Sequence, residues 1–278
     1  MKNKVSFDFK HGKVEGLYLS IESGNAPLVI ITNGQNGFYN YGMFPYIQEK
    51  LFESGIASYS YNFSHGGILG NSDYFSELDL YEKNCMRLET EDLCEIVKHL
   101  KESEIKFTGK NKLIFFSHSM GSVPTIFGTK ELLSKGYKVD GVILVSPVNS
   151  LDRWSEEIME DWEKNGVRLV KNNRTKQDLP QGKEFLEEVK EANGIWNIRN
   201  ALKGANTNYL IIHGDNDEAV PVEQSIDLNN WNSEYKHNTT LKIIPNGTHT
   251  FNTQHPFEVP SEELDLMIKE SVAWINKL

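Results

Sequence analysis

The sequence has few cysteines, no long apolar run and fewer basic than acidic residues, and each shortage excludes a class of protein. Its two cysteines, Cys85 and Cys94, lie nine positions apart in one helical-looking segment. Their side chains cannot easily meet there, so we expect packed residues with free thiols. No apolar run approaches the ~18 residues of a membrane span, and residues 1–10 lack the apolar core of a signal peptide. We therefore expect a cytoplasmic protein with no membrane partner.

The charge balance argues against a nucleic-acid partner. The 278 residues include 29 Lys and Arg against 39 Asp and Glu, which gives a formal net charge of −10 without any basic block. Such a field repels phosphate backbones and anionic membrane surfaces. The sequence also lacks a glycine-rich nucleotide loop and the histidine–carboxylate spacing of a zinc helix. It therefore implies neither a metal nor another cofactor.

Short apolar runs alternate with longer amphipathic stretches along most of the chain. This alternation predicts an α/β fold, in which a mostly parallel sheet of eight strands carries helices on both faces. The first two strands are expected to form an antiparallel hairpin around His11 and Gly12. The expected strands are 5–10, 14–21, 28–32, 57–62, 113–116, 142–145, 209–213 and 241–244, and the expected helices are 43–54, 81–101, 121–135, 222–232 and 261–277.

Residues 149–204 break this alternation. They contain no strand-like run, only charged helical stretches at 154–165 and 182–192 joined by a polar stretch. A block of this length between two buried strands is too long for a simple crossover. We therefore expect an α/β body, residues 1–148 and 205–278, with a small helical cap over the carboxyl edge of the sheet, where ligands of open α/β sheets bind.

Ser119 directly follows a buried strand and precedes a helix that starts with small residues, in the run KLIFFSHSMGSVPTIFG. In a nucleophile elbow the serine occupies a strained strand-to-helix turn, so the residues two positions away must be small. Here those residues are Ser117 and Gly121. The helix amino terminus supports developing negative charge. Taken alone, the pattern fits a polar turn about as well as a nucleophile.

An acid and a histidine follow the next predicted strands in the order that a Ser-acid-His triad requires. Asp217 lies in HGDNDEAVP after strand 209–213, and His249 lies in PNGTHTFN after strand 241–244. Both loops are expected at the same edge of the sheet as Ser119. Each residue alone could be an ordinary turn or surface residue. Three such turns in this order are much less easily explained by chance.

With these motifs, the chain resembles the α/β-hydrolase superfamily from about Pro27 to the carboxyl terminus, in particular its small capped esterases and its dienelactone-hydrolase-like and prolyl-oligopeptidase-like branches. The usual GxSxG appears as SxSxG, and the GxxHxF pattern is only partly kept before His249. The GxxDxxVP pattern makes Asp217, rather than Asp215, the triad acid. It is matched by Gly214, Asp217, Val220 and Pro221.

The resemblance implies a role for each group. Ser119 Oγ attacks the acyl carbonyl after giving its proton to His249, while Asp217 orients the imidazole. The backbone N–H groups of Met120 and Gln35 form the oxyanion hole, with Asn33 and Gly34 where the family usually has HG.

The substrate pocket is the least determined part of the site. Aromatic side chains can line such a pocket, but the tryptophans of a short cap can equally pack it onto the body. By resemblance, His118 and His213 are packing or hydrogen-bonding residues. The residues that we place in the pocket are Asn36, His65, Trp154 and Trp196.

Our leading hypothesis is a serine hydrolase that cleaves a small-molecule carboxylic ester through an acyl-serine intermediate. A serine aminopeptidase or acyl-peptide hydrolase, with Glu156 or Asp161 anchoring a substrate amine, and an acyl-thioesterase remain open. So does a degenerate fold that binds a ligand without chemistry, since Ser117 and Asn33 depart from the family pattern. The substrate is then a small ester or amide, and a homodimer is compatible with the sequence.

The triad hypothesis predicts that hydrolysis becomes faster as the pH rises. A histidine must be neutral to accept the serine proton, so kcat/KM should increase through ~6.5, where histidines ordinarily titrate. The measurement is a pH profile of ester hydrolysis. A flat profile across that range, with chemistry limiting the rate, would contradict the role of His249.

Overall fold

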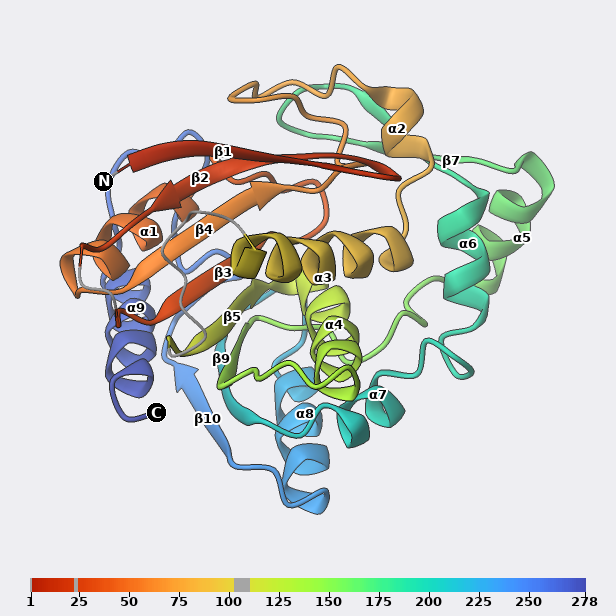
Figure 1. Cartoon of the computed structure of the whole chain (residues 1–278). Helices are drawn as coiled ribbons and strands as arrows, with labels where there is room; N and C mark the ends of the chain where they lie inside the picture. The colour runs from red at the N-terminus through yellow and green to blue at the C-terminus, as the bar shows by residue number, and fades with distance from the viewer. Residues whose placement is uncertain (1, 23–24, 103–110) are drawn as a thin grey trace.

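The centre of the molecule is an eight-stranded sheet (Figure 1). The computed structural model describes residues 2–22, 25–102 and 111–278. The strand order is β1-β2-β4-β3-β5-β6-β9-β10, and the sheet is parallel from β4 to β10, while β2 runs antiparallel to β1 and β4. Each strand lies where the sequence predicts one. The strands are β1 (Lys2–Phe9), β2 (Gly12–Leu19), β3 (Leu28–Thr32), β4 (Ala57–Asn62), β5 (Leu113–His118), β6 (Gly141–Val145), β9 (Asn208–Gly214) and β10 (Thr239–Ile244).

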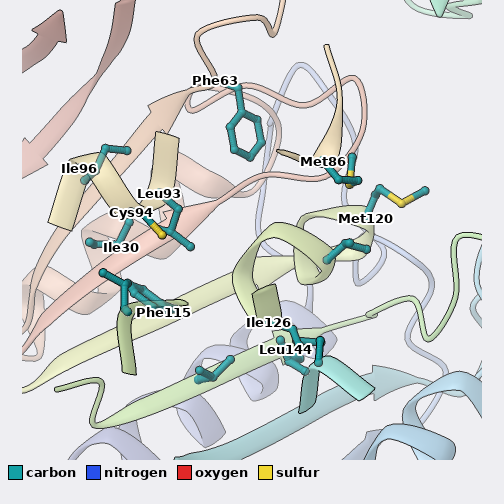
Figure 2. Packing of buried hydrophobic residues seen from close by; sticks show 14 of the residues in the cluster. Ile30, Phe63, Met86, Leu93, Cys94, Ile96, Phe115, Met120, Ile126 and Leu144 are labelled. Carbon is teal, nitrogen blue, oxygen red and sulfur yellow. The ribbon is translucent and has the colours of Figure 1, made fainter. Parts of the chain in front are cut away.

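Helices cover both faces of this sheet. Successive strand residues point to opposite faces, so Leu28 and Ile30 join one apolar cluster while Val29 and Ile31 join another. Figure 2 shows the first cluster, where Leu93 and Cys94 lie close to Ile30. The first face carries α3 (Met86–Glu102), α4 (Ser122–Ser134) and α8 (Glu223–Glu234), and the second carries α1 (Phe44–Glu53) and α9 (Glu262–Ile275) (Figure 1).

The helices bury both cysteines and several end near glycines, but one of them is shorter than predicted. Both cysteines are buried and free, as predicted. Gly55 and Gly136 follow the ends of α1 and α4 with φ values of 76° and 81°, the left-handed conformation that ends many helices. The single helix predicted at 81–101 is wrong, because the chain forms α2 (Leu78–Glu82) and then α3. No helix in the described part of the chain is long and apolar enough to cross a membrane.

The segment 149–204 contains strands that the sequence pattern did not predict. Between α5 (Glu156–Asn165) and α6 (Lys183–Lys190), the strands β7 (Arg168–Lys171) and β8 (Asp178–Gln181) form an antiparallel hairpin. The expectation of a purely helical segment is therefore wrong. These strands are four residues each and carry charged side chains, so they leave no apolar run to detect. The segment ends in α7 (Ile198–Gly204), which packs on α4 and α8. The division into body and cap stays a prediction.

Polar contacts join α6 to the start of α3 and the residue after β8 to the end of α2. The buried Glu188 carboxylate accepts hydrogen bonds from the N–H groups of Met86 and Arg87, at 2.6 and 2.9 Å. Free N–H groups at a helix start favour such a negative charge. The N–H of Gly182 donates to Glu82 O at 2.9 Å, and a Cβ at Gly182 would lie 2.3 Å from that oxygen. These contacts join residues 182–188 to α2 and α3.

The buried Glu89 of α3 should make stability depend on pH. Burial raises its pKa to about 8, although Asn84 Nδ2 donates a hydrogen bond to it at 2.7 Å. A raised carboxyl pKa gives a contribution to stability that is full below the unfolded pKa of ~4.3 and is lost as the pH rises through about 8. We expect Glu89→Gln to remove this loss. As the pH rises across that range, the unfolding free energy of the variant should increase by a few kcal/mol relative to that of the wild type.

Urea unfolding at several pH values measures this difference. Glu91→Gln, on the same helix but at a partly exposed position, controls for the removal of a carboxylate. A difference between Glu89→Gln and wild type that stays constant with pH would contradict the role of burial.

Candidate active site

Ser119 occupies the strained turn that the sequence predicts. It follows β5 and opens a short 3-10 turn, Ser119–Gly121, that leads into α4. Its φ of 55° lies in the left-handed region, which is unusual for a residue with a side chain and typical of a nucleophile elbow. Ser117 replaces the usual glycine, and its buried Oγ has no hydrogen-bond partner among the described residues.

The loop after β3 packs directly on this elbow. A Cβ at Gly121 would lie 2.4 Å from Asn33 O, and one at Gly34 would lie 2.9 Å from Ser119 Cβ. Only glycine fits at both positions. The contact places Gln35 next to the elbow, while Met120 lies in the first helical turn, where N–H groups lack an acceptor within the helix. Both residues line a small cavity together with Gly34. Their role as oxyanion donors stays a prediction.

Asp217 and His249 meet on the loops that follow β9 and β10. His249 Nδ1 lies 2.8 Å from Asp217 Oδ2, and the Asp217 side chain is fully buried. A carboxylate at Nδ1 requires the proton on that nitrogen and leaves the Nε2 lone pair free to accept another. Asp217 Oδ1 also accepts hydrogen bonds from the N–H groups of Ala219 and Val220, both at 2.9 Å.

A second buried histidine supports the same carboxylate. His213 Nε2 lies 3.1 Å from Asp217 Oδ2 and 2.9 Å from Val220 O, so it carries the proton. Its Nδ1 then accepts from the Ser225 hydroxyl at 2.6 Å. Burial alone would raise the pKa of Asp217, but hydrogen bonds from His213 and His249 lower that pKa well below its usual range. Asp217 is therefore a stable anion, and His213 is the hydrogen-bonding residue that the sequence predicts.

Two further contacts fix the histidine loop. His118 Nε2 lies 2.8 Å from His249 O, and burial lowers the pKa of His118 to about 3, so its ring is neutral and donates this hydrogen bond. Asp215 Oδ1 accepts from the N–H of Asn246 at 2.6 Å. Thus Asp215 ties the two loops together, while Asp217 contacts His249. The role of Asp217 as the triad acid stays a prediction.

Ser119 and His249 line one cavity of about 390 Å³. Such a volume suits a small organic ligand. The predicted residues Gln35 and Asn36 also contribute to its wall. The connection between β7 and β8 supplies residues that the sequence analysis missed, and its only sequence signal is the polar turn NNRTKQ. These residues are Asn172, Asn173 and Arg174, next to Lys171 at the end of β7. The other wall residues that the sequence analysis missed are Gly37, Tyr41, Phe44 and Thr250.

Solved structures share this architecture over nearly the whole chain. Est1E from Butyrivibrio proteoclasticus is 16% identical, with a TM-score of 0.68 over 99% of this chain and 98% of its own. A dienelactone hydrolase from Anabaena variabilis is 16% identical, with a TM-score of 0.64 over 100% and 97% of the two chains. The mouse α/β-hydrolase domain-containing protein 10 is 14% identical, with a TM-score of 0.68 over 99% of each chain.

This chain has the α/β-hydrolase fold. The sheet order and the long overlap with these structures decide it. No family model and no curated protein matches its sequence. The likeness is therefore one of fold, and the chemistry has to be argued from the site itself.

Three residues placed in the pocket from the sequence lie elsewhere in the α/β-hydrolase fold. Trp154 packs edge to face on the fully buried Trp162, and Trp196 packs on Phe127 of α4, with ring centroids 4.6 Å apart. Trp154 therefore packs within the segment 149–204 and Trp196 packs against α4, and neither ring lines the cavity beside Ser119. His65 is buried with Ser64 Oγ 2.9 Å from its Nδ1, under the β1–β2 turn. Of the four predicted pocket residues, Asn36 alone lines that cavity.

Gln35 and Asn36 separate this cavity from a smaller one. The smaller cavity, of about 30 Å³, extends toward Met120, Glu89 and Gln181. Its volume suits ordered water rather than an acyl group. A substrate therefore has room in the cavity that Ser119 and His249 share.

Asp217→Asn and Asp215→Asn form a matched pair of variants on one loop. An amide at 217 can turn its NH₂ toward His249 and favour the wrong tautomer, so we expect kcat to fall by ~10³- to 10⁴-fold. Asp215→Asn keeps an acceptor for Asn246 and should lose less than about tenfold. Ester hydrolysis and thermal unfolding of both variants provide the measurement. Equal losses in the two variants would contradict the assignment of Asp217.

Proposed function

We propose that the protein is a serine hydrolase that cleaves a small-molecule carboxylic ester through an acyl-serine intermediate. One observation carries the proposal. The strained Ser119 shares a cavity with His249, whose Nδ1 bonds the buried anion Asp217. This combination gives a serine oxygen, a base with a free lone pair and a fixed counter-charge, which is the set of groups that acyl transfer requires.

The reaction proceeds in two steps. His249 Nε2 takes the proton from Ser119 Oγ as the oxygen attacks the ester carbonyl, and the N–H groups of Gln35 and Met120 stabilise the oxyanion. The alcohol leaves with that proton, and an acyl-serine remains. Water then attacks the acyl group with the same base, which releases the acid and restores Ser119. Asp217 stabilises the imidazolium in both steps.

Observations of two kinds favour an ester over a peptide. The structural neighbours include a dienelactone hydrolase and an Est1E structure with bound ferulic acid. Glu156 and Asp161, which a serine aminopeptidase could use to hold a substrate amine, are exposed on α5 and do not line the cavity. No Asp or Glu lies among the described residues of its wall. A thioester substrate follows the same chemistry and is one arm of a substrate screen.

A fluorophosphonate probe tests the nucleophile directly. We expect it to label Ser119, and we expect Ser119→Ala to lose labelling and to lower kcat by ~10⁴-fold or more. Ser117→Ala removes a serine from the same motif and should keep both properties, so it is the matched control. A folded wild-type protein that stays unlabelled, or hydrolysis that persists in Ser119→Ala, would overturn the proposal.

A further inference from the structure

We propose that the substrate is an ester that carries a carboxylate, and that Arg174 of the β7–β8 hairpin binds this carboxylate while Lys171 of the same hairpin attracts it. This inference rests on the proposed function and names the substrate class of the same cavity. The class is a half-ester of a dicarboxylic acid, in which one carboxyl group is esterified and the other is free.

The charge of the cavity is opposite to that of the chain. The protein has a formal net charge of −10, yet the wall beside Ser119 has Lys171 and Arg174 and no acidic residue within the described residues. Neither cation forms an ion pair in the part of the chain that the structure describes. Many other cations do, as Lys190 does with Glu163 at 2.6 Å. A cleft lined by one sign of charge concentrates ligands of the opposite sign.

Arg174 is held in place with part of its guanidinium unused. The group lies over the rings of Phe38 and Tyr41, 5.2 and 5.8 Å from their centroids. Nη1 donates to the backbone oxygen of Asp73. The Asp73 carboxylate instead lies 3.1 Å from His255 Nε2. Nη2 is buried and has no acceptor among the described residues. A buried donor without a partner is unfavourable, so an acceptor from a ligand would stabilise it.

The hairpin turn fixes the backbone at this position. Asn172 Oδ1 accepts hydrogen bonds from the N–H groups of Arg174 and Thr175, both at 3.0 Å. The N–H of Lys176 donates to Asn172 O at 2.9 Å and closes the turn. A side chain on such a turn loses little freedom when it binds, which favours specific recognition over a loose surface charge.

The geometry favours a carboxylate on the ligand. The planar guanidinium fork matches a carboxylate, and such charge-assisted hydrogen bonds are stronger than neutral ones. Lys171 is exposed at the end of β7, so it adds long-range attraction more than a fixed contact. The bound carboxylate takes no part in bond making. Ser119 acts on the ester carbonyl, and the products are the dicarboxylate and the alcohol after one water is consumed.

Monoethyl succinate and ethyl succinamate test this inference. They have nearly the same shape, but the first ends in a carboxylate and the second in a neutral amide. We expect kcat/KM to be roughly 10- to 100-fold higher for monoethyl succinate, and added salt should lower only that value. Equal values for both esters would overturn the inference. They would leave the proposed function intact, provided that hydrolysis still requires Ser119.

Variants of the hairpin locate the effect. Arg174→Gln should lower the ratio of the two kcat/KM values about tenfold or more, and Arg174→Lys should lower it less. Lys171→Gln should mainly weaken the salt dependence of this ratio. Lys176→Gln removes a cation from the same hairpin outside the cavity wall and should leave the ratio unchanged. A ratio that stays high in Arg174→Gln would overturn the assignment of that residue.

Binding to Ser119→Ala gives a readout that does not need turnover. Calorimetry with succinate and with inorganic phosphate separates a carboxylate site from a general anion site. We expect succinate to bind Ser119→Ala more tightly than phosphate does, and the double variant Ser119→Ala/Arg174→Gln to bind succinate at least tenfold more weakly. Tighter binding of phosphate, or succinate binding that ignores Arg174, would overturn the inference.

Discussion

The buried carboxylate of Asp217 is the charge on which the arrangement of the site depends. Two histidines and two backbone N–H groups donate to it, and together they hold it as an anion without contact with solvent. A buried charge is tolerated only when it is hydrogen-bonded in this way. Because His213 belongs to β9 and His249 to the loop after β10, the same contacts join two neighbouring strands at their carboxyl ends. The anion therefore sets the tautomer of His249 and also the position of its loop.

A second constraint acts on the other side of Ser119. The loop after β3 and the elbow approach so closely that neither Gly34 nor Gly121 has room for a Cβ. This contact brings the backbone of Gln35 to the serine without any side chain having to reach it. The Ser117 side chain fits beside the elbow, although its hydroxyl has no partner among the described residues. The departure from GxSxG thus leaves the strained turn in place, with φ of Ser119 at 55°.

The parts of the structure that could be predicted are those that follow from short local patterns in the sequence. The central strands β3, β5, β6 and β9 are short, buried and largely apolar runs. The elbow and the two following loops carry small or charged residues at defined distances from strand ends. The hairpin of residues 168–181 escaped prediction because each of its four-residue strands has charged or polar residues at its ends, which makes it resemble a polar loop. At the break between α2 and α3, the N–H of Met86 donates to Glu188, which is about a hundred residues away, so no local pattern reveals this contact. Trp154 and Trp196 pack on other rings, so the aromatic content of residues 149–204 does not reveal which rings face the cavity.

The same hairpin shows why the sequence pattern predicts the reacting groups but not the substrate that they act on. The serine, histidine and acid belong to the edge of the sheet, so their positions follow from strand order. Arg174 reaches the cavity only because Asn172 closes a turn and two aromatic rings from the segment after β3 support the guanidinium. None of these contacts is local in sequence except the turn itself. A substrate class that depends on Arg174 is thus a property of how the segment 149–204 packs, and the hydrolase fold alone does not determine it.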